Sequence, residues 1–192
     1  MSLPLWLTST LASDAAAGKG VMTGVVRPFR PGQRIAAIAS TLAVAEGDNL
    51  FFKDAVARGG PGGPVLVIGG SPTAHRAVMG GILATAAAAA GFTAVVTDGV
   101  IRDSAEIAEL GLAVWCRGTT PVAGSKNGPG GAGETITCAG VLVSPGDAVI
   151  ADDDGVVIWP AARIAELVEK AKARLASDAE RLAQIRVGKG GI

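Results

Sequence analysis

The segment GGILATAAAAAGFTAVVTDGVIRD, residues 80–103, constrains the fold more than any other part of the chain. A glycine pair precedes an alanine-rich stretch, 82–90, whose composition predicts a helix that ends at a glycine. A β-branched run over 93–97 predicts a strand, followed by an Asp-Gly turn and an Arg102-Asp103 pair. Because a strand after a helix runs back across its sheet, this order places Arg102 and Asp103 near the start of the helix.

The predicted helix start combines several features of an anion site. Gly80 and Gly81 allow a ligand to approach the backbone, and the first N–H groups of a helix have no partner within the helix. Together with the helix dipole they favour a carboxylate. Arg102 can grip such a group in a fork, and Asp103 can hold a hard divalent cation. Spacing alone leaves a second interpretation open, in which the glycines only begin a helix and the pair is a surface salt bridge.

The rest of the chain alternates between strand and helix patterns. Two short apolar runs flank Asp152-Asp153-Asp154-Gly155, which we interpret as a hairpin turn, since the alternating acids and closing glutamate of a calcium loop are absent. The pattern predicts an α/β sandwich with a mixed sheet in a single domain, 1–192, with flexible ends at 1–7 and 188–192. The predicted strands are 21–26, 34–44, 65–68, 112–116, 149–151 and 156–159, and the remaining predicted helices are 5–17, 49–58, 104–110 and 161–182.

Composition excludes several classes of function. Lysine plus arginine equals aspartate plus glutamate, 17 each, and aromatic residues make up 4%, so neither a basic field nor a base-stacking platform for nucleic acid is expected. No apolar run approaches the ~20 residues of a membrane span, and we expect a cytoplasmic protein. Cys116 and Cys138 fit buried thiols better than a disulfide. His75, the single histidine, has no metal-binding neighbours and is expected at the surface.

A glycine-rich segment, 117–134, is predicted to be a loop. A loop of this length in a compact domain is usually functional or mobile. Because this one is rich in small residues and long enough to reach a neighbouring subunit, we expect that the protein is not a monomer.

Several motifs together resemble one known family. The chain is similar to the class II pyruvate aldolases of the 4-hydroxy-4-methyl-2-oxoglutarate aldolase family, which includes the regulator of ribonuclease E activity A. The similarity extends over about residues 8–168. It is carried by SDAA (13–16), PGGPVLVI (61–68), GGILATAA (80–87), VVTDGVIRD (95–103), RGTTPV (117–122) and AGVLVSPGDAVIADDDGVVIWP (139–160).

The resemblance implies a swivelling-type α/β sandwich that assembles as a homotrimer or homohexamer. It implies cleavage of a 4-hydroxy-2-oxo acid to pyruvate, with possible oxaloacetate decarboxylation, and a requirement for Mg²⁺ or Mn²⁺. Arg102, Asp103 and Glu106 would be catalytic, and Asp103 would hold the metal. The substrate would meet Arg102 and the backbone N–H groups of four consecutive residues, Gly80, Gly81, Ile82 and Leu83.

This chemistry agrees with the residue types. Retro-aldol cleavage leaves an enolate on the pyruvyl half, and a cation and an arginine beside its oxygen stabilise the charge. A water on the metal or a nearby carboxylate would take the 4-hydroxyl proton. We expect no lysine at this site, which favours the metal route over an imine route.

The sequence departs from the family pattern at two glycines. Gly81 and Gly69 stand where many members carry an acid, which bears on proton transfer and on metal affinity. Three functions therefore stay open: a metal-dependent aldolase, a chiefly decarboxylating enzyme, and a non-catalytic oligomeric regulator that binds a protein partner. Asp103 and Glu106 favour an enzyme, because the metal-holding aspartate is typically missing from the regulators.

Overall fold

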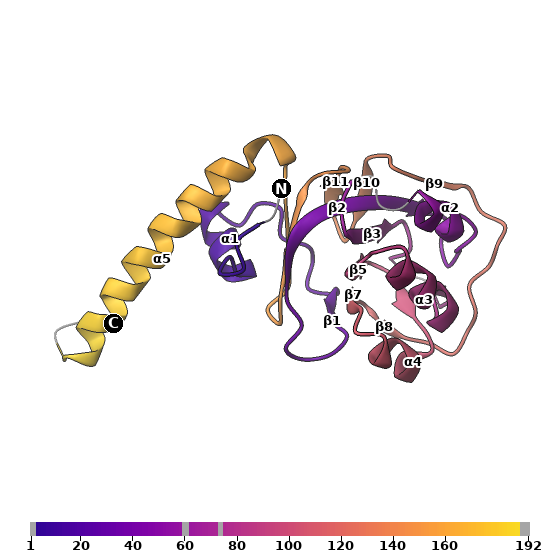
Figure 1. Cartoon of the computed structure of the whole chain (residues 1–192), viewed down its shortest axis with the longest axis horizontal. Helices are drawn as coiled ribbons and strands as arrows, with labels where there is room; N and C mark the ends of the chain where they lie inside the picture. Colours follow the sequence, from indigo (N-terminus) through magenta and orange to yellow (C-terminus); the bar gives the residue numbers. More distant parts are fainter. Residues whose placement is uncertain (1–2, 59–61, 73–74, 189–192) are drawn as a thin grey trace.

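A curled mixed sheet forms the centre of the computed structural model, which describes residues 3–58, 62–72 and 75–188 (Figure 1). Its strand order is β1-β7-β5-β3-β2-β12-β13, with β9 paired to the far end of β2. The four inner strands β2, β3, β5 and β7 are parallel, and the others are antiparallel to their neighbours. The bounds are β1 Arg27–Pro28, β2 Ile35–Val44, β3 Val65–Gly69, β5 Ala94–Thr97, β7 Ala113–Cys116, β9 Gly130–Ala132, β12 Ala148–Ala151 and β13 Val156–Trp159.

Helices cover one face of the parallel strands and a hairpin covers the other. The helices are α2 (Phe52–Ala57), α3 (Gly81–Ala89) and α4 (Ser104–Glu109), and the hairpin is β10 (Ile136–Cys138) with β11 (Val141–Val143). The helical side of the core joins side chains from all three helices to β2, β3, β5 and β7. Every residue of β3 is buried, which explains its unbroken apolar sequence, because a central parallel strand is covered on both faces.

A separate hydrophobic cluster joins the two ends of the described chain. Helix α1 (Ser9–Ala15) packs against α5 (Ile164–Arg186) and the β12–β13 hairpin. Leu3 and Leu7 are buried in this cluster. Residues 1–2 and 189–192, at the ends expected to be flexible, lie outside the described part. The buried residues of α5 end at Ala171, and the rest of the helix extends away from the body (Figure 1).

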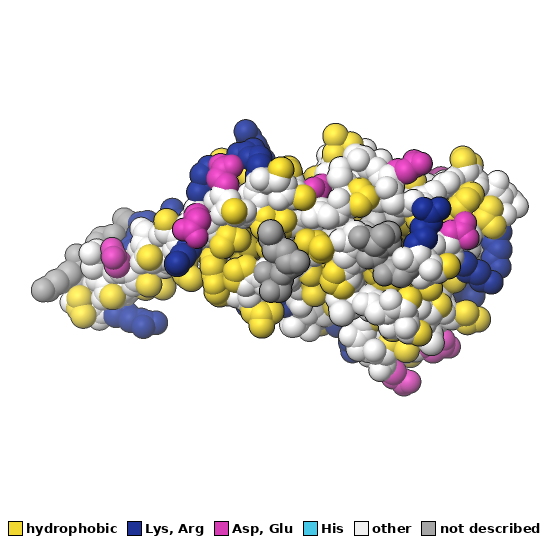
Figure 2. All heavy atoms as spheres, turned by 45° about the horizontal axis from the view of Figure 1, so that its top comes forward, with side chains coloured by type: hydrophobic (Ala, Val, Ile, Leu, Met, Phe, Trp, Pro, Cys, Tyr) yellow, Lys and Arg dark blue, Asp and Glu magenta, His cyan; other side chains and the backbone are white. Residues whose placement is uncertain are grey.

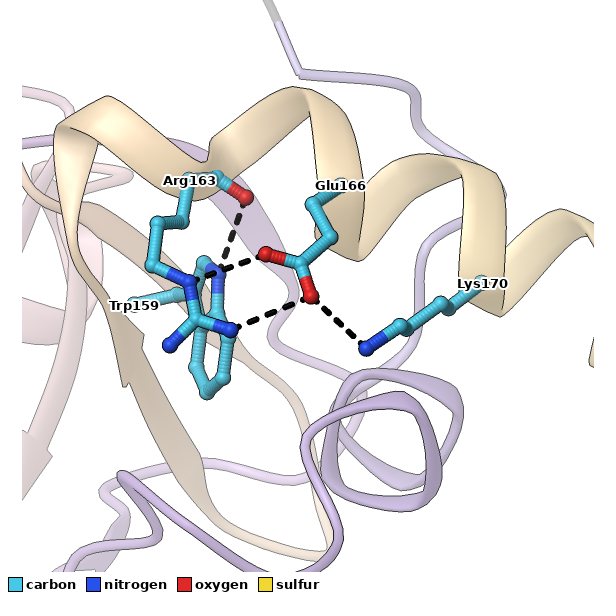
Figure 3. Close-up of polar contacts among 4 residues, drawn as sticks. All are labelled: Trp159, Arg163, Glu166 and Lys170. Carbon is cyan, nitrogen blue, oxygen red and sulfur yellow. Dashed lines mark hydrogen bonds and ion pairs between the residues drawn. The ribbon is translucent and has the colours of Figure 1, made fainter.

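Polar contacts fix the beginning of α5 after a short 3₁₀ turn, η1 (Ala161–Arg163) (Figure 3). The Trp159 indole N–H donates to the Arg163 carbonyl (3.0 Å), and the Arg163 guanidinium lies over the indole ring, 5.0 Å from its centroid. Glu166 forms ion pairs with Arg163 (2.9 Å) and Lys170 (2.7 Å). The hydrogen bond from Arg163, followed by the one from Lys170, lowers the pKa of Glu166 to about 2. The carboxylate therefore keeps its charge well into the acid range.

A second, three-stranded parallel sheet lies beside the main one and carries the candidate site. It consists of β4 (Ala77–Met79), β6 (Val100–Ile101) and β8 (Gly118–Thr119), in the order β4-β6-β8. The sequence did not predict these strands, because segments of two or three residues are too short to show a period-2 pattern. The predicted loop 117–134 accordingly contains two short strands, β8 and β9.

The structure also bears on several local predictions. The predicted strand 21–26 is wrong: Val21 forms an isolated bridge to Val157, and the N–H groups of Met22 and Thr23 donate to Val156 and Ala139. The Asp152–Gly155 hairpin turn is confirmed. Both cysteines are free and buried, and burial raises the pKa of Cys116 to about 11 and that of Cys138 further. His75 is exposed. Within the described ranges, no helix has the length and apolar character needed to cross a bilayer.

Candidate active site

The candidate site lies where the three short parallel strands end. Gly80 follows β4, Arg102 follows β6 and Thr120 follows β8. Because parallel strands end at the same sheet edge, these segments lie side by side. The Arg102 N–H donates to the Met79 carbonyl (3.0 Å), which joins the end of β4 to the segment after β6.

Asp103 connects this edge to the start of α3. Its carboxylate Oδ2 accepts the Gly81 N–H (3.0 Å) and lies 3.4 Å from the Arg102 Nε. The expected approach of the Arg102-Asp103 pair to the helix start is thus observed. Asp103 has φ +57° and ψ +47°, a left-handed conformation that is uncommon for a residue with a side chain, although aspartate adopts it more readily than most.

This contact changes which backbone donors are open at the helix start. The Gly81 N–H is occupied by Asp103, whereas the first intrahelical bond runs from the Ala84 N–H to the Gly80 carbonyl (2.9 Å). The amides of Ile82 and Leu83 come before that bond, so they are the donors that the helix leaves for an anion.

Gly80 is required here by close packing. A Cβ atom at this position would lie 2.6 Å from the Asp103 Oδ2 and 2.9 Å from the Arg102 Nε. Its backbone angles, φ −131° and ψ −174°, are ordinary for any residue. The absent side chain therefore makes room for the Arg102-Asp103 pair and is not needed for the backbone conformation.

Gly81 and Gly69, the two positions where the resemblance leads us to expect an acid, have different surroundings. A Cβ at Gly81 would strike the Glu106 carboxylate, so Glu106 occupies the space that a side chain at 81 would take. A Cβ at Gly69 would strike the Thr137 carbonyl in β10, so the hairpin excludes a side chain there. Neither glycine lines the cavity described next, but the Gly81 N–H donates to Asp103, which does line it.

A cavity of about 400 Å³ opens beside the Arg102-Asp103 pair. Three basic side chains line it, Lys53, Arg102 and Lys126, against the single carboxylate of Asp103. Basic side chains also gather on the surface at the end of the molecule that carries α2 and α3 (Figure 2). Such a site favours a ligand with more than one negative charge. The other lining residues are Asn49, Leu50, Ala77, Gly80, Ile82, Leu83, Ala123 and Gly124.

The two lysines are the residues that sequence reasoning missed. The expectation of a lysine-free site is wrong, because Lys53 comes from α2 and Lys126 from the loop between β8 and β9. One signal was present: Lys126 is the single basic residue between Arg117 and Glu134, in a loop whose length indicated a functional or mobile segment.

Asn49 adds a polar group to the same wall. Its Oδ1 and the Arg30 Nε are the buried side-chain polar atoms that lack a hydrogen-bond partner in the described part of the chain. A buried polar atom without a partner costs about 1–3 kcal/mol. The Asn49 Oδ1 is such an unsatisfied acceptor, buried in a residue that lines the cavity.

Glu106 lies in a neighbouring hollow. That hollow, of about 480 Å³, is lined by Arg102, Asp103, Glu106 and Thr120, among others. The structure thus brings Gly80, Ile82, Leu83, Arg102 and Asp103 together around one cavity and places Glu106 on the other side of the Arg102-Asp103 pair.

The residues present fit a weakly ligated hard cation. In the described ranges no three His, Cys, Asp or Glu side chains form a metal-binding group, so a cage made entirely of protein ligands is not found there. The contacts of the Asp103 side chain with the Gly81 N–H and with the Arg102 Nε both use Oδ2, and the side chain is 33% exposed. One carboxylate oxygen with water and ligand oxygens is the usual way in which proteins hold Mg²⁺.

The chain is similar to several known proteins. A protein of Halalkalibacterium halodurans, provisionally named 4-hydroxy-4-methyl-2-oxoglutarate aldolase, is 34% identical over 175 residues, which is 91% of this chain and 83% of that protein. The crystal structure of Streptomyces coelicolor RraAS2, described as an unusual member of the RNase ES inhibitor RraA family, superposes with a TM-score of 0.80, 27% identity and 91% coverage of both chains.

A second solved structure is the RNA-processing inhibitor RraA from Thermus thermophilus. It has a TM-score of 0.69 and 29% identity, and the match covers 83% of this chain and 94% of that one. The family model described as RraA-like, Aldolase/RraA, matches residues 9–158. This range includes the whole cavity lining and most of the central sheet. The chain therefore belongs to the RraA-like family of aldolases and RraA proteins.

Proposed function

We propose that this protein is a divalent-metal-dependent lyase that cleaves a 4-hydroxy-2-oxo acid, of the 4-hydroxy-4-methyl-2-oxoglutarate type, to pyruvate. The observation that carries the proposal is the Arg102-Asp103 pair at the start of α3, beside a cavity that three basic side chains line. Membership of the RraA-like family and the aldolase names of relatives support it.

The residues around the cavity have separate roles in this proposal. The Ile82 and Leu83 amides bind the carboxylate of the pyruvyl half, and Arg102 donates to its oxo oxygen. Lys53 and Lys126 attract the distal carboxylate of a dianionic substrate. As the C4 hydroxyl loses its proton, its oxygen forms a C4=O bond and the C3–C4 bond breaks, which releases the second carbonyl product. The electron pair of the broken bond forms C2=C3, and the C2 oxygen takes the negative charge of the enolate. Arg102 stabilises that charge, and protonation at C3 gives pyruvate.

Asp103 is the residue that would hold the metal. When bound, a divalent cation supplies positive charge beside the oxygen of the developing enolate. Glu106, beyond the Arg102-Asp103 pair, is the carboxylate that we assign to proton transfer. Its position against Gly81 means that it approaches the space where many relatives carry an acid.

The direct test is a pyruvate-release assay with a panel of 4-hydroxy-2-oxo acids and oxaloacetate. Oxaloacetate decarboxylation passes through the same enolate, so we expect both reactions, with dianionic substrates preferred over monoanionic ones of equal length. Absence of pyruvate release from every substrate, in the presence of Mg²⁺ or Mn²⁺, would refute the lyase assignment.

Chelation provides a second prediction. Exhaustive EDTA treatment is expected to abolish pyruvate release, and Mg²⁺ or Mn²⁺ to restore it, because Asp103 then lacks the cation that stabilises the enolate. Borohydride added with pyruvate should leave the activity intact. Because two lysines line the cavity, the opposite pattern, full activity after EDTA and inactivation by borohydride, would indicate an imine on Lys53 or Lys126 instead.

The alternative function is a non-catalytic oligomeric regulator that binds a protein partner. Similarity to the two RraA proteins favours it, as does the absence of an acid at Gly81.

The proposal also includes a cytoplasmic homotrimer or homohexamer. Exposed apolar side chains at the cavity mouth, Leu50 at 43% and Ile82 at 80%, support contact with a second copy.

A further inference from the structure

Asp48 is a buried carboxylate next to the cavity that no role above uses. It lies between β2 and α2 and is 2% exposed. Its Oδ1 accepts the Leu50 N–H (2.8 Å). Its Oδ2 accepts three hydrogen bonds from the loop after β8, from the Ser125 hydroxyl (2.9 Å), the Asn127 N–H (2.7 Å) and the Gly128 N–H (3.1 Å).

These contacts surround Lys126. The residues on both sides of it, Ser125 and Asn127, bind the same carboxylate oxygen. Two backbone hydrogen bonds also join the loop to the 47–50 segment. The Asn49 N–H donates to the Ser125 carbonyl (3.0 Å), and the Ser125 N–H donates to the Gly47 carbonyl (2.9 Å). The loop thus has its position set by the 47–50 segment, which also carries the Asn49 side chain to the cavity.

The packing around this contact leaves the loop little freedom. A Cβ at Gly128 would strike the Ala45 side chain and lie 3.4 Å from the Asp48 Cγ. Glycine therefore lets the loop backbone approach the carboxylate closely enough for the Gly128 N–H to bind it. The Asp48 carboxylate thus accepts the hydrogen bonds that hold the irregular loop segment 125–128 in place.

We propose that Asp48 is a positioning residue that fixes Lys126 and Asn49 side by side on one wall of the cavity, and so sets the affinity of that wall for the distal anionic group of the ligand. This inference rests on the proposed function for the identity of the ligand. Asp48 itself does not line the cavity, so it acts through Lys126 and Asn49 alone.

The electrostatics agree with the geometry. Burial raises the pKa of the Asp48 carboxyl, but hydrogen bonds from Leu50, Asn127, Ser125 and Gly128 lower it more, so the pKa lies below its ordinary value. The carboxylate is ionised at neutral pH, and charge-assisted acceptors make stronger hydrogen bonds than neutral ones.

The test measures binding of succinate, a simple dicarboxylate, by calorimetry with Mg²⁺ present. Asp48→Ala is expected to raise the Kd about tenfold, as is Lys126→Ala, because each removes a charge-assisted contact or its support. The double variant should bind no more weakly than Asp48→Ala alone, since Asp48→Ala already removes the contribution of Lys126. Asp48→Asn, which keeps one oxygen for the loop, should show a smaller increase and serves if Asp48→Ala does not fold.

Asp147 offers a matched control. It is 8% exposed and joins two segments through the Ser144 N–H (2.8 Å) and the Ala161 N–H (2.9 Å), but it lines no part of the cavity. Asp147→Ala and Asp147→Asn should lower the thermal unfolding midpoint and leave the Kd for succinate unchanged. Hydrogen exchange of the 125–128 amides should accelerate in the Asp48 variants and stay unchanged in the Asp147 variants.

Two results would overturn the positioning role: wild-type affinity for succinate in the Asp48 variants, or additive losses in the double variant. Failure of the wild-type protein to bind succinate would show that this wall does not bind anions, and would therefore also overturn the proposal. The lyase assignment is tested separately. If the wild-type protein releases pyruvate but Asp48→Ala binds succinate normally, the lyase assignment stands and the role of Asp48 is rejected. If the losses in succinate affinity of the Asp48 and Lys126 variants are non-additive but no substrate releases pyruvate, the role of Asp48 stands and the lyase assignment is rejected.

Discussion

Replacement of Arg102 by lysine is expected to lower the turnover number for pyruvate release by about 10²–10³-fold, nearly as much as replacement by alanine. Lysine keeps the positive charge but loses the planar two-point grip on the oxo oxygen. The loss should be similar for aldol cleavage and for oxaloacetate decarboxylation, because both form the same enolate. Stability should change little, since the Arg102 side chain is 38% exposed and its ion pair with Asp103 is at the surface.

Arg174→Lys is the matched control for this experiment. Arg174 also pairs with aspartates, Asp14 and Asp178, but it lies on α5 away from the cavity. That variant should retain full activity. If Arg102→Lys keeps turnover within a few-fold of the wild-type value for both reactions, Arg102 is a structural ion-pair partner, and the site must be sought elsewhere on the molecule.

Gly80→Ala is expected to remove activity while the protein stays folded. The added methyl group would lie 2.6 Å from the Asp103 Oδ2 and 2.9 Å from the Arg102 Nε, so both side chains must move away from the helix start. A displacement of about 1 Å at a reacting centre can cost about 10²-fold in rate. The backbone at Gly80 accepts alanine, and the atoms that must move are the ends of flexible side chains, so the unfolding midpoint should change little.

The control for Gly80→Ala is Gly131→Ala in β9. A Cβ at Gly131 meets no atom within 4 Å, and its effect on both stability and turnover should be small. The two measurements are the thermal unfolding midpoint and the turnover number for pyruvate release. Wild-type turnover in Gly80→Ala would mean that the Arg102-Asp103 geometry at the start of α3 does not matter to the reaction.

Patterns along the chain were sufficient to predict most of the main sheet. The strands 34–44, 65–68, 93–97 and 112–116 appear as β2, β3, β5 and β7, because each is a β-branched or apolar run. β3 and β5 are buried throughout, whereas the first part of β2 is half-buried. The prediction of a strand over 21–26 was wrong. The N–H groups of Met22 and Thr23 donate to the carbonyls of Val156 and Ala139, which lie in different hairpins. A local apolar pattern cannot show which partner a backbone group will find.

One half of the candidate site was also predictable, because the residues that form it are close in sequence. A helix, a strand and a short turn separate Gly80 from Asp103, so local geometry returns the Arg102-Asp103 pair to the start of α3, where Asp103 binds the Gly81 N–H. Only the tertiary structure decided the other half. Lys53 and Lys126 reach the cavity from α2 and from a distant loop, and the Asp48 carboxylate that holds this loop acts across 77 to 80 residues of chain. Such contacts depend on how distant elements pack against one another, so they cannot be predicted from local sequence patterns.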